Sequence, residues 1–225
     1  MSRYGILPSS SVTSRNVAIP PVGLAGILTV PMGTAGLVVF AHGSGSSRFS
    51  PRNTAVAQAL NDRRFATLLF DLLTPWEEAD RAKVFDISLL AERLVDVVQW
   101  LGGQEQMIAK LPLGLFGAST GAAAALVAAA RLPARIGAVV SRGGRPDLAG
   151  DTLPLVRAPT LLIVGGADEA VIELNEAALA RLHGPKALEI VEGATHLFPE
   201  AGAMDVVIDH ASRWFDRYLA KSTGL

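Results

Sequence analysis

The chain contains no cysteine, which excludes disulfide bonds, thiolate catalysis and cysteine-based metal sites. It also has almost no excess of either charge, because 20 Lys and Arg residues oppose 21 Asp and Glu residues. The basic residues are scattered, so nothing indicates binding to nucleic acid or to an acidic membrane surface. Long hydrophobic runs are absent too, since apolar stretches such as 37–41 and 161–164 are too short to span a bilayer.

The chain has 225 residues, and half of them are hydrophobic. This length and composition are enough to bury a substantial core, and they predict one domain over residues 1–225. Residues 1–15 are expected to form a poorly ordered or peripheral N-terminal segment. The first 14 residues are polar and rich in serine, without the apolar region of a secretory signal. Together with the lack of cysteine, this favours a cytoplasmic protein. The sequence leaves the oligomeric state open between a monomer and a homodimer.

The hydrophobic pattern alternates between short apolar runs and helical periodicity, without internal repeats or linkers. Residues 17–31 predict two antiparallel strands around Pro20-Pro21. Continuous apolar runs predict further buried strands over 36–41, 65–70, 113–116, 136–141, 160–164 and 187–191. Helices are predicted over 53–62, 86–101, 121–131, 169–182 and 203–219, and loops over 72–85 and 142–159. This order indicates an α/β fold with a mostly parallel sheet, helices on both faces and no separate lid domain.

One motif points to chemistry: residues 117–121 read Gly-Ala-Ser-Thr-Gly, between a predicted strand and an alanine-rich predicted helix. This is the G-x-S-x-G nucleophile elbow in the strand-turn-helix context that gives it meaning. The small residues on either side of Ser119 fit a tight, strained turn. They also leave room for other segments of the chain to pass close to Ser119. The following helix directs free N–H groups at the reacting centre.

A serine hydroxyl needs a base, which is in turn oriented by a carboxylate, in the chain order Ser, Asp or Glu, His. Asp168 and His196 each follow a predicted strand and fit this order with Ser119. The alternatives are an N-cap role for Asp168 and an ordinary surface-loop role for His196. Asp147 and Asp151 replace Asp168 only if their loop folds inward.

A loop of glycine and serine, residues 42–47, follows an earlier predicted strand and suggests an oxyanion loop. Ser44 is the predicted backbone donor, with Gly45 as second choice, and the N–H of Thr120 completes a two-donor hole. Read alone, the segment is a generic turn. It lacks the Lys-Ser or Lys-Thr ending of a phosphate-binding P-loop. His42 is a candidate substrate-binding residue, and the alternative is that it braces the loop.

Several further residues at predicted strand ends are candidates for substrate binding. Arg142 is the chosen one, and Arg48 and Arg145 are alternatives, because an arginine there could hold a carboxylate or phosphate. The competing interpretation is that these arginines anchor loops. Asp71 either structures the site or contacts substrate, and Trp76 either lines the pocket or covers the core.

These residues together resemble the α/β-hydrolase superfamily, over nearly the whole chain. The compact size, the loop that begins at His42 and the elbow around Ser119 are similar to the dienelactone hydrolase-related group. The resemblance implies an eight-stranded, mostly parallel sheet and cofactor-free hydrolysis, with Ser119 as nucleophile, His196 as base and Asp168 as its orienting acid. The namesake enzymes use a cysteine nucleophile, which this chain lacks.

The resulting hypothesis is a serine carboxylesterase that cleaves small to medium esters, with a small-molecule ester as its partner and no metal. The same three residues also suit a thioesterase, an amidase or a lactone hydrolase. A ligand-binding protein of the hydrolase fold, with little turnover, is the non-enzymatic alternative.

Overall fold

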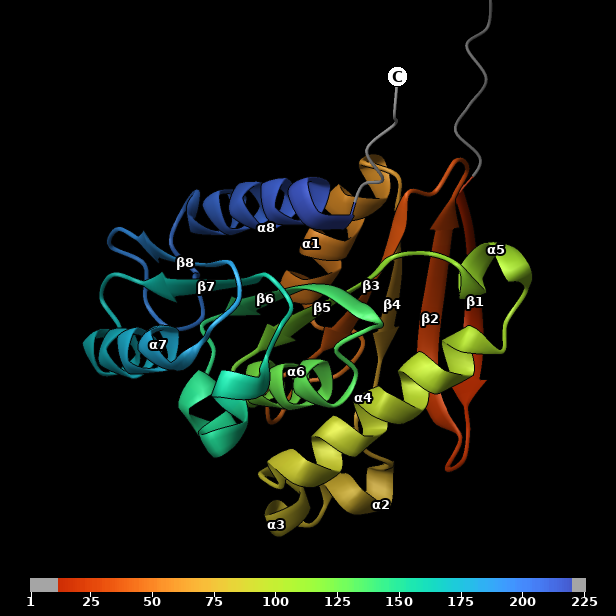
Figure 1. The fold of residues 1–225 in the computed structure, drawn as a ribbon, viewed down its shortest axis with the longest axis horizontal. Helices are drawn as coiled ribbons and strands as arrows, with labels where there is room; N and C mark the ends of the chain where they lie inside the picture. The colour runs from red at the N-terminus through yellow and green to blue at the C-terminus, as the bar shows by residue number, and fades with distance from the viewer. Residues whose placement is uncertain (1–11, 220–225) are drawn as a thin grey trace, which may run out of the picture.

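The computed structural model describes residues 12–219, which form one eight-stranded sheet with helices on both faces (Figure 1). The strands are β1 (Val12–Ile19), β2 (Leu24–Pro31), β3 (Gly36–Ala41), β4 (Phe65–Phe70), β5 (Leu113–Ala118), β6 (Ile136–Arg142), β7 (Thr160–Gly165) and β8 (Lys186–Val191). Their order in the sheet is β1-β2-β4-β3-β5-β6-β7-β8. β2 pairs antiparallel with both β1 and β4, and the other neighbouring pairs are parallel. The predicted fold class is therefore confirmed.

The N-terminal hairpin matches the prediction in kind and differs from it in extent. β1 and β2 pair along their whole length, from Val12 opposite Pro31 to Ile19 opposite Leu24. Residues 12–15, assigned from the sequence to a peripheral segment, are therefore part of the edge strand. The remainder of that segment, residues 1–11, lies outside the described residues.

Two layers of helices cover the sheet (Figure 1). α1 (Pro51–Asp62) and α8 (Ala203–Leu219) pack on one face, and α4 (Ile87–Gly102), α6 (Thr120–Arg131) and α7 (Glu169–Arg181) lie on the other. Strands β3, β4, β5 and β7 are buried along their whole length, as their continuous apolar sequences predict. Separate apolar cores lie on the two faces.

The closing helix α8 follows its predicted bounds. Val207 and Ala211 are buried as expected, and Phe215 and Leu219 complete the apolar face. Trp214 and Tyr218, predicted on the same face, lie at its border with their ring centroids 4.7 Å apart. The four-residue spacing of the buried positions explains why the helix forms here.

The two segments predicted as loops contain short helices. Residues 72–85 hold α2 (Pro75–Glu78) and α3 (Arg81–Val84), and residues 142–159 hold a 3₁₀ segment, η1 (Pro146–Leu155). A further single turn, α5 (Gln106–Ala109), precedes β5. Thr74 and Glu77 form a capping box at the start of α2. Such single turns are fixed by caps, so hydrophobic periodicity does not detect them.

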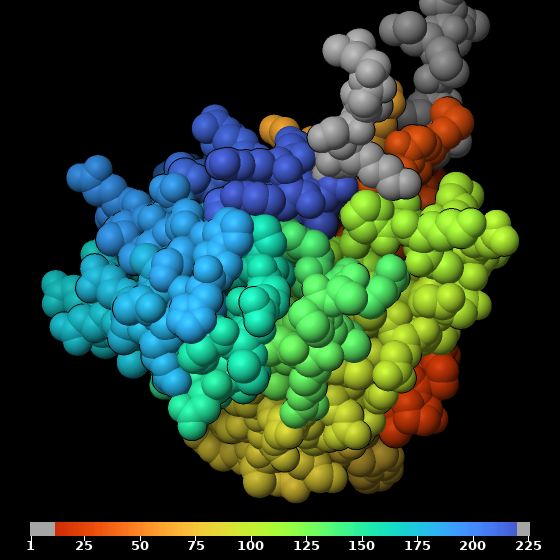
Figure 2. All heavy atoms as spheres, in the orientation of Figure 1, coloured from red at the N-terminus to blue at the C-terminus, as the bar shows by residue number. Residues whose placement is uncertain are grey.

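Figure 2 shows the same face with all heavy atoms, where α8 and the segment that carries α2 and α3 lie at opposite ends of the molecule. None of the helices within residues 12–219 combines the length and the apolar character needed to cross a membrane.

Candidate active site

Ser119 sits on a strained turn between β5 and α6. Its φ of +50° and ψ of −122° lie outside the regions that a residue with a side chain normally adopts. The flanking glycines permit this turn. A Cβ at Gly117 would lie 2.4 Å from Ala122 Cα, and one at Gly121 would lie 2.2 Å from the Ala41 carbonyl oxygen. The small residues that the motif predicts are thus required by close backbone approach.

Asp168 and His196 are brought together by the ends of β7 and β8. His196 Nδ1 lies 2.7 Å from Asp168 Oδ2, so the ring donates its Nδ1 proton to the carboxylate. This bond leaves Nε2 with the free lone pair. Asp168 occupies the N-cap position of α7, yet its side chain makes no capping bond. The carboxylate therefore serves the histidine and not the helix.

The competing carboxylates are engaged elsewhere. Asp147 accepts two bonds from Arg145, at 2.8 and 2.7 Å. Asp151 pairs with Arg181 at 2.9 Å, and its side chain is fully exposed. Neither carboxylate lies at the site, so Asp168 is the acid that the fold places beside His196.

Ser119 and His196 line one cavity of about 210 Å³, together with Ser44 and Arg142. Within the part of the chain that the structure describes, no hydrogen bond joins the two side chains directly. Catalytic hydrogen bonds are often long without substrate and tighten when it binds. Ser119 and His196 therefore face the same cavity, where a bound substrate would contact both side chains.

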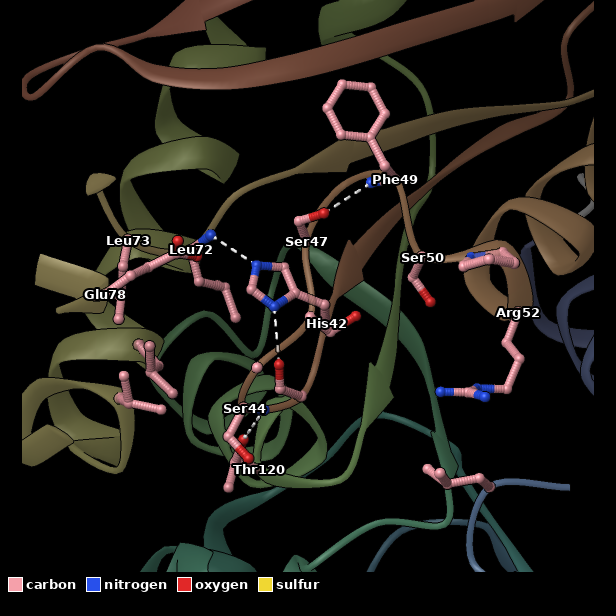
Figure 3. A pocket seen from close by; sticks show the side chains of 17 residues that line it. His42, Ser44, Ser47, Phe49, Ser50, Arg52, Leu72, Leu73, Glu78 and Thr120 are labelled. Carbon is pink, nitrogen blue, oxygen red and sulfur yellow. Dashed lines mark hydrogen bonds between the residues drawn. The ribbon is translucent and has the colours of Figure 1, made fainter. Parts of the chain in front are cut away.

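The loop after β3 crosses directly over the serine. A Cβ at Gly43 would lie 2.9 Å from Ser119 Cβ. Thr120 is the first residue of α6, so its N–H has no acceptor within the helix. Ser44 donates its N–H to Thr120 Oγ1 at 3.1 Å (Figure 3). The two residues predicted to form the oxyanion hole are therefore adjacent. The Ser44 N–H, predicted as a donor to the oxyanion, donates its hydrogen bond to the Thr120 hydroxyl in this structure.

His42 braces this loop from below the surface. The side chain is buried, with only 7% of the residue exposed. Nδ1 donates to the Gly43 carbonyl at 3.0 Å and Nε2 accepts the Leu72 N–H at 3.1 Å (Figure 3). Burial lowers the pKa of His42 below its ordinary 6.5, which favours this neutral form. Both nitrogens are used, so the geometry supports the bracing role. His42 also lines a cavity beside this loop, and its contact with substrate stays a prediction.

Trp76 corrects another prediction. It lies on α2 with 89% of its surface exposed, so it neither lines a described cavity nor covers the core. The neighbouring Glu77 is fixed by the capping box and by Arg93, whose Nη2 lies 2.8 Å from Glu77 Oε1. Holding Glu77 inward turns the adjacent side chain toward solvent.

The three candidate arginines have different surroundings. Arg48 forms an ion pair with Asp71 and also donates its backbone N–H to Asp71 Oδ1 at 2.7 Å. Arg145 is held by Asp147. Both of these arginines, and Asp71 itself, therefore anchor loops. Arg142 is 5% exposed, has no carboxylate partner among residues 12–219 and lines the cavity of Ser119.

Sequence reasoning missed Arg52, which lines the same cavity from the first turn of α1. An arginine at a helix N-terminus lies at the unfavourable end of the helix dipole. That misplaced charge, directly after Pro51, is the signal that could have identified the residue.

A second, larger cavity of about 750 Å³ is lined by the loop that begins at His42 and by the start of α1 (Figure 3). Leucines 72, 73 and 90 and Val84 give it an apolar wall. Ser44, Ser50 and Arg52 line both cavities. Over the described part of the chain, no group of three or more His, Asp or Glu side chains is arranged to hold a metal ion.

Comparison with known proteins places this geometry in a family. No family model matches the chain. The crystal structure of a dienelactone hydrolase from Anabaena variabilis is 52% identical in sequence, with a TM-score of 0.88, over 93% of this chain and 99% of that one. The chain belongs to the dienelactone hydrolase group of the α/β-hydrolases. An esterase domain from Rhodothermus marinus, 21% identical with a TM-score of 0.73 over 93% of this chain and 99% of that one, shares its fold.

A Mycobacterium tuberculosis protein, provisionally named a phosphoribosyl transferase, is 60% identical over 203 residues. The match covers 90% of this chain but only 46% of that relative, so this α/β-hydrolase chain spans about half the length of the curated relatives it matches. More than half of the mycobacterial protein thus has no counterpart in the alignment. Its name describes the whole relative, and the match does not assign the named activity to either part of it.

Proposed function

We propose that the chain is a serine hydrolase that cleaves carboxylic esters of small to medium size through an acyl-enzyme intermediate. The observation that carries the proposal is the Asp168–His196 bond beside the strained Ser119, all at the carboxyl ends of parallel strands. Nucleophile, base and orienting acid in this order suit acyl transfer. Membership of a hydrolase family and the esterase fold neighbour agree with it.

In the first half of the reaction, Ser119 Oγ attacks the ester carbonyl carbon while His196 Nε2 accepts the hydroxyl proton. The oxyanion that forms accepts a hydrogen bond from the N–H of Thr120. It also accepts the hydrogen bond of the Ser44 N–H, in place of Thr120 Oγ1. The bond to the alcohol oxygen then breaks, and His196 returns the proton to the leaving alcohol. The acyl group is left on Ser119.

In the second half, His196 takes a proton from water, and the resulting hydroxide attacks the acyl carbon. The bond to Ser119 Oγ breaks, and the protonated His196 restores the serine hydroxyl. The carboxylic acid leaves. Asp168 holds the imidazole in the tautomer that both halves need and stabilises its charged form.

The apolar wall of the larger cavity supports a hydrocarbon acyl or alcohol group of modest size. The Anabaena relative is called a dienelactone hydrolase, and a lactone is an internal ester that the same steps would open. We place simple esters first because the nucleophile here is a serine.

The test is turnover of 4-nitrophenyl acetate and butyrate. Ser119→Ala removes the attacking oxygen, and we expect a loss of about 10⁶-fold in kcat, because the members of such a triad act as a unit. Ser14→Ala, on the exposed edge strand β1, is the matched control and retains activity. Turnover by Ser119→Ala at the rate of the wild type would refute the proposal.

Related acyl groups give a second comparison. Rates on matched ester, thioester and anilide substrates rank the leaving groups directly. The proposal expects the ester to give the highest kcat/KM. A stable adduct after one burst of product, on every substrate, would instead indicate a binding protein without useful turnover.

A further inference from the structure

Arg142 is a buried cation without a counterion. It ends β6 beside the elbow, where its carbonyl accepts the Ser119 N–H at 3.4 Å. The single hydrogen bond of its side chain within residues 12–219 joins Nη2 to Asn53 Oδ1 at 3.5 Å, and its Nε has no partner. The guanidinium also lies over the Phe198 ring, 5.9 Å from the ring centroid, but no carboxylate among the described residues neutralises its charge. Burial, together with the charge of Arg52, lowers the pKa of Arg142 to about 10, so the group is still charged at neutral pH.

Arg52 adds a second uncompensated charge. It reaches from the first turn of α1 into the region shared by the two cavities (Figure 3). Its Nε is buried and also lacks a partner among the described residues. It is close enough to Arg142 to oppose that group's charge. Two guanidinium groups held together in this way repel each other unless an anion lies between them.

The start of α1 favours an anion at the same place. The helix is 12 residues long, is capped by the Ser50 side chain and has no acidic residue in its first turn. Its N-terminus therefore carries an unopposed partial positive charge. Ser46 and Ser50, which line the cavity with the arginines, add hydroxyl donors.

The cavity of Ser119 is strongly cationic as a result. Of the residues that line it between positions 12 and 219, two are arginines and none is an aspartate or glutamate. Two fixed positive charges are balanced by a dianion, whereas a carboxylate would leave one charge unmatched. The planar guanidinium fork also suits phosphate oxygens.

We propose that Arg142 and Arg52 form a phosphate-binding subsite, and that the ester cleaved at Ser119 carries a phosphate or phosphonate group. This inference rests on the proposed hydrolase function for its chemistry, but the anion site itself is independent of turnover. The subsite positions the substrate and takes no part in bond making. Its loss should therefore raise KM more than it lowers kcat.

The direct probe is inorganic phosphate, titrated calorimetrically into the Ser119→Ala protein at pH 8 and constant ionic strength. We expect saturable one-to-one binding that is at least tenfold tighter than the binding of acetate. Arg52→Met and Arg142→Met should each weaken phosphate binding by about tenfold or more, the loss expected for one charge-assisted contact. Arg213→Met, on the exposed face of α8, is the matched control and should bind phosphate as the parent does.

Arg52 is only partly buried, so its variant keeps the test valid if Arg142→Met fails to fold. Acetate binding as tight as phosphate, or phosphate binding that survives Arg52→Met, would overturn the phosphate assignment.

The substrate test compares 4-nitrophenyl 3-phosphonopropanoate with 4-nitrophenyl butyrate. The wild type should show a KM at least tenfold lower for the phosphonate, and Arg52→Met should abolish that preference while retaining turnover of the butyrate. Equal KM values with active hydrolysis would overturn the subsite alone. Phosphate binding without any ester hydrolysis would retain the subsite and remove the proposed function.

Discussion

At the scale of single residues, the site depends on hydrogen bonds that select one protonation state. The bond to Asp168 fixes His196 with its proton on Nδ1, and the contacts of His42 fix that ring in its neutral form. His196 is thus oriented for the proposed role of base, and His42 is held in a structural role. Each assignment predicts a different response to substitution.

Asp168→Asn replaces the acceptor by a group that can donate, which favours the wrong tautomer of His196. We expect kcat for 4-nitrophenyl butyrate to fall by about 10⁴-fold, the size of the effect when a triad acid is replaced in this way. Asp147→Asn, which removes a carboxylate bonded to Arg145, is the matched control. A fall for the control and not for Asp168→Asn would move the role of acid to Asp147.

The lowered pKa of His42 predicts a loss of stability in acid. Because the folded-state pKa lies below 6.5, the unfolded chain takes up a proton first as the pH drops. The contribution of neutral His42 is therefore full above pH 6.5, declines below it and levels off under the folded-state pKa. His42→Asn does not titrate there and keeps an N–H donor near the Nδ1 position.

Urea unfolding at pH 8 and pH 5 measures this contribution. The wild type should lose more unfolding free energy between the two pH values than His42→Asn does. Equal losses would show that His42 does not contribute.

At the scale of elements, the elbow depends on how closely α6 approaches the end of β3. Gly121 lies against the backbone oxygens of Ala41 and His42, and Gly117 lies against the backbone of α6. Neither contact leaves room for a methyl group. The helix therefore approaches the sheet as closely as its backbone allows, and this places Thr120 beside Ser44.

Gly121→Ala should consequently destabilise the protein. Its Cβ would lie 2.2 Å from a backbone oxygen that cannot move without shifting β3, so we expect a loss of about 3 kcal/mol. Gly102→Ala, at a helix end with open space around its Cα, is the control and should change stability by less than about 1 kcal/mol. Chemical denaturation compares the two variants. Similar midpoints would contradict the packing argument.

The sequence predicted most helices and strands of this architecture because their patterns are local. It did not predict α2 and α3, since single capped turns have no periodicity. It also gave Trp76 the wrong environment, because the orientation of α2 is set by an ion pair between Glu77 and Arg93, a residue 16 positions further along the chain. Contacts of that kind cannot be derived from the local pattern.

At the scale of the whole molecule, the parallel sheet gathers residues that are far apart in the chain. Ser119, Asp168 and His196 follow β5, β7 and β8, whose carboxyl ends share one edge. The motif around Ser119, and the positions of Asp168 and His196 after predicted strands, were enough to predict that these three would lie at one edge of the sheet. They were not enough for the Ser44–Thr120 bond, which joins residues 76 positions apart, or for Arg52, which α1 brings into the cavity.

The most direct test of the account is covalent labelling of the wild-type chain with a fluorophosphonate, followed by mass spectrometry of the intact protein and its peptides. The account predicts one adduct, on the peptide that contains Ser119, which is absent from Ser119→Ala and forms more slowly in Asp168→Asn. An adduct of equal yield in Ser119→Ala, or no adduct on the folded wild type, would contradict the claim that Ser119 is the nucleophile.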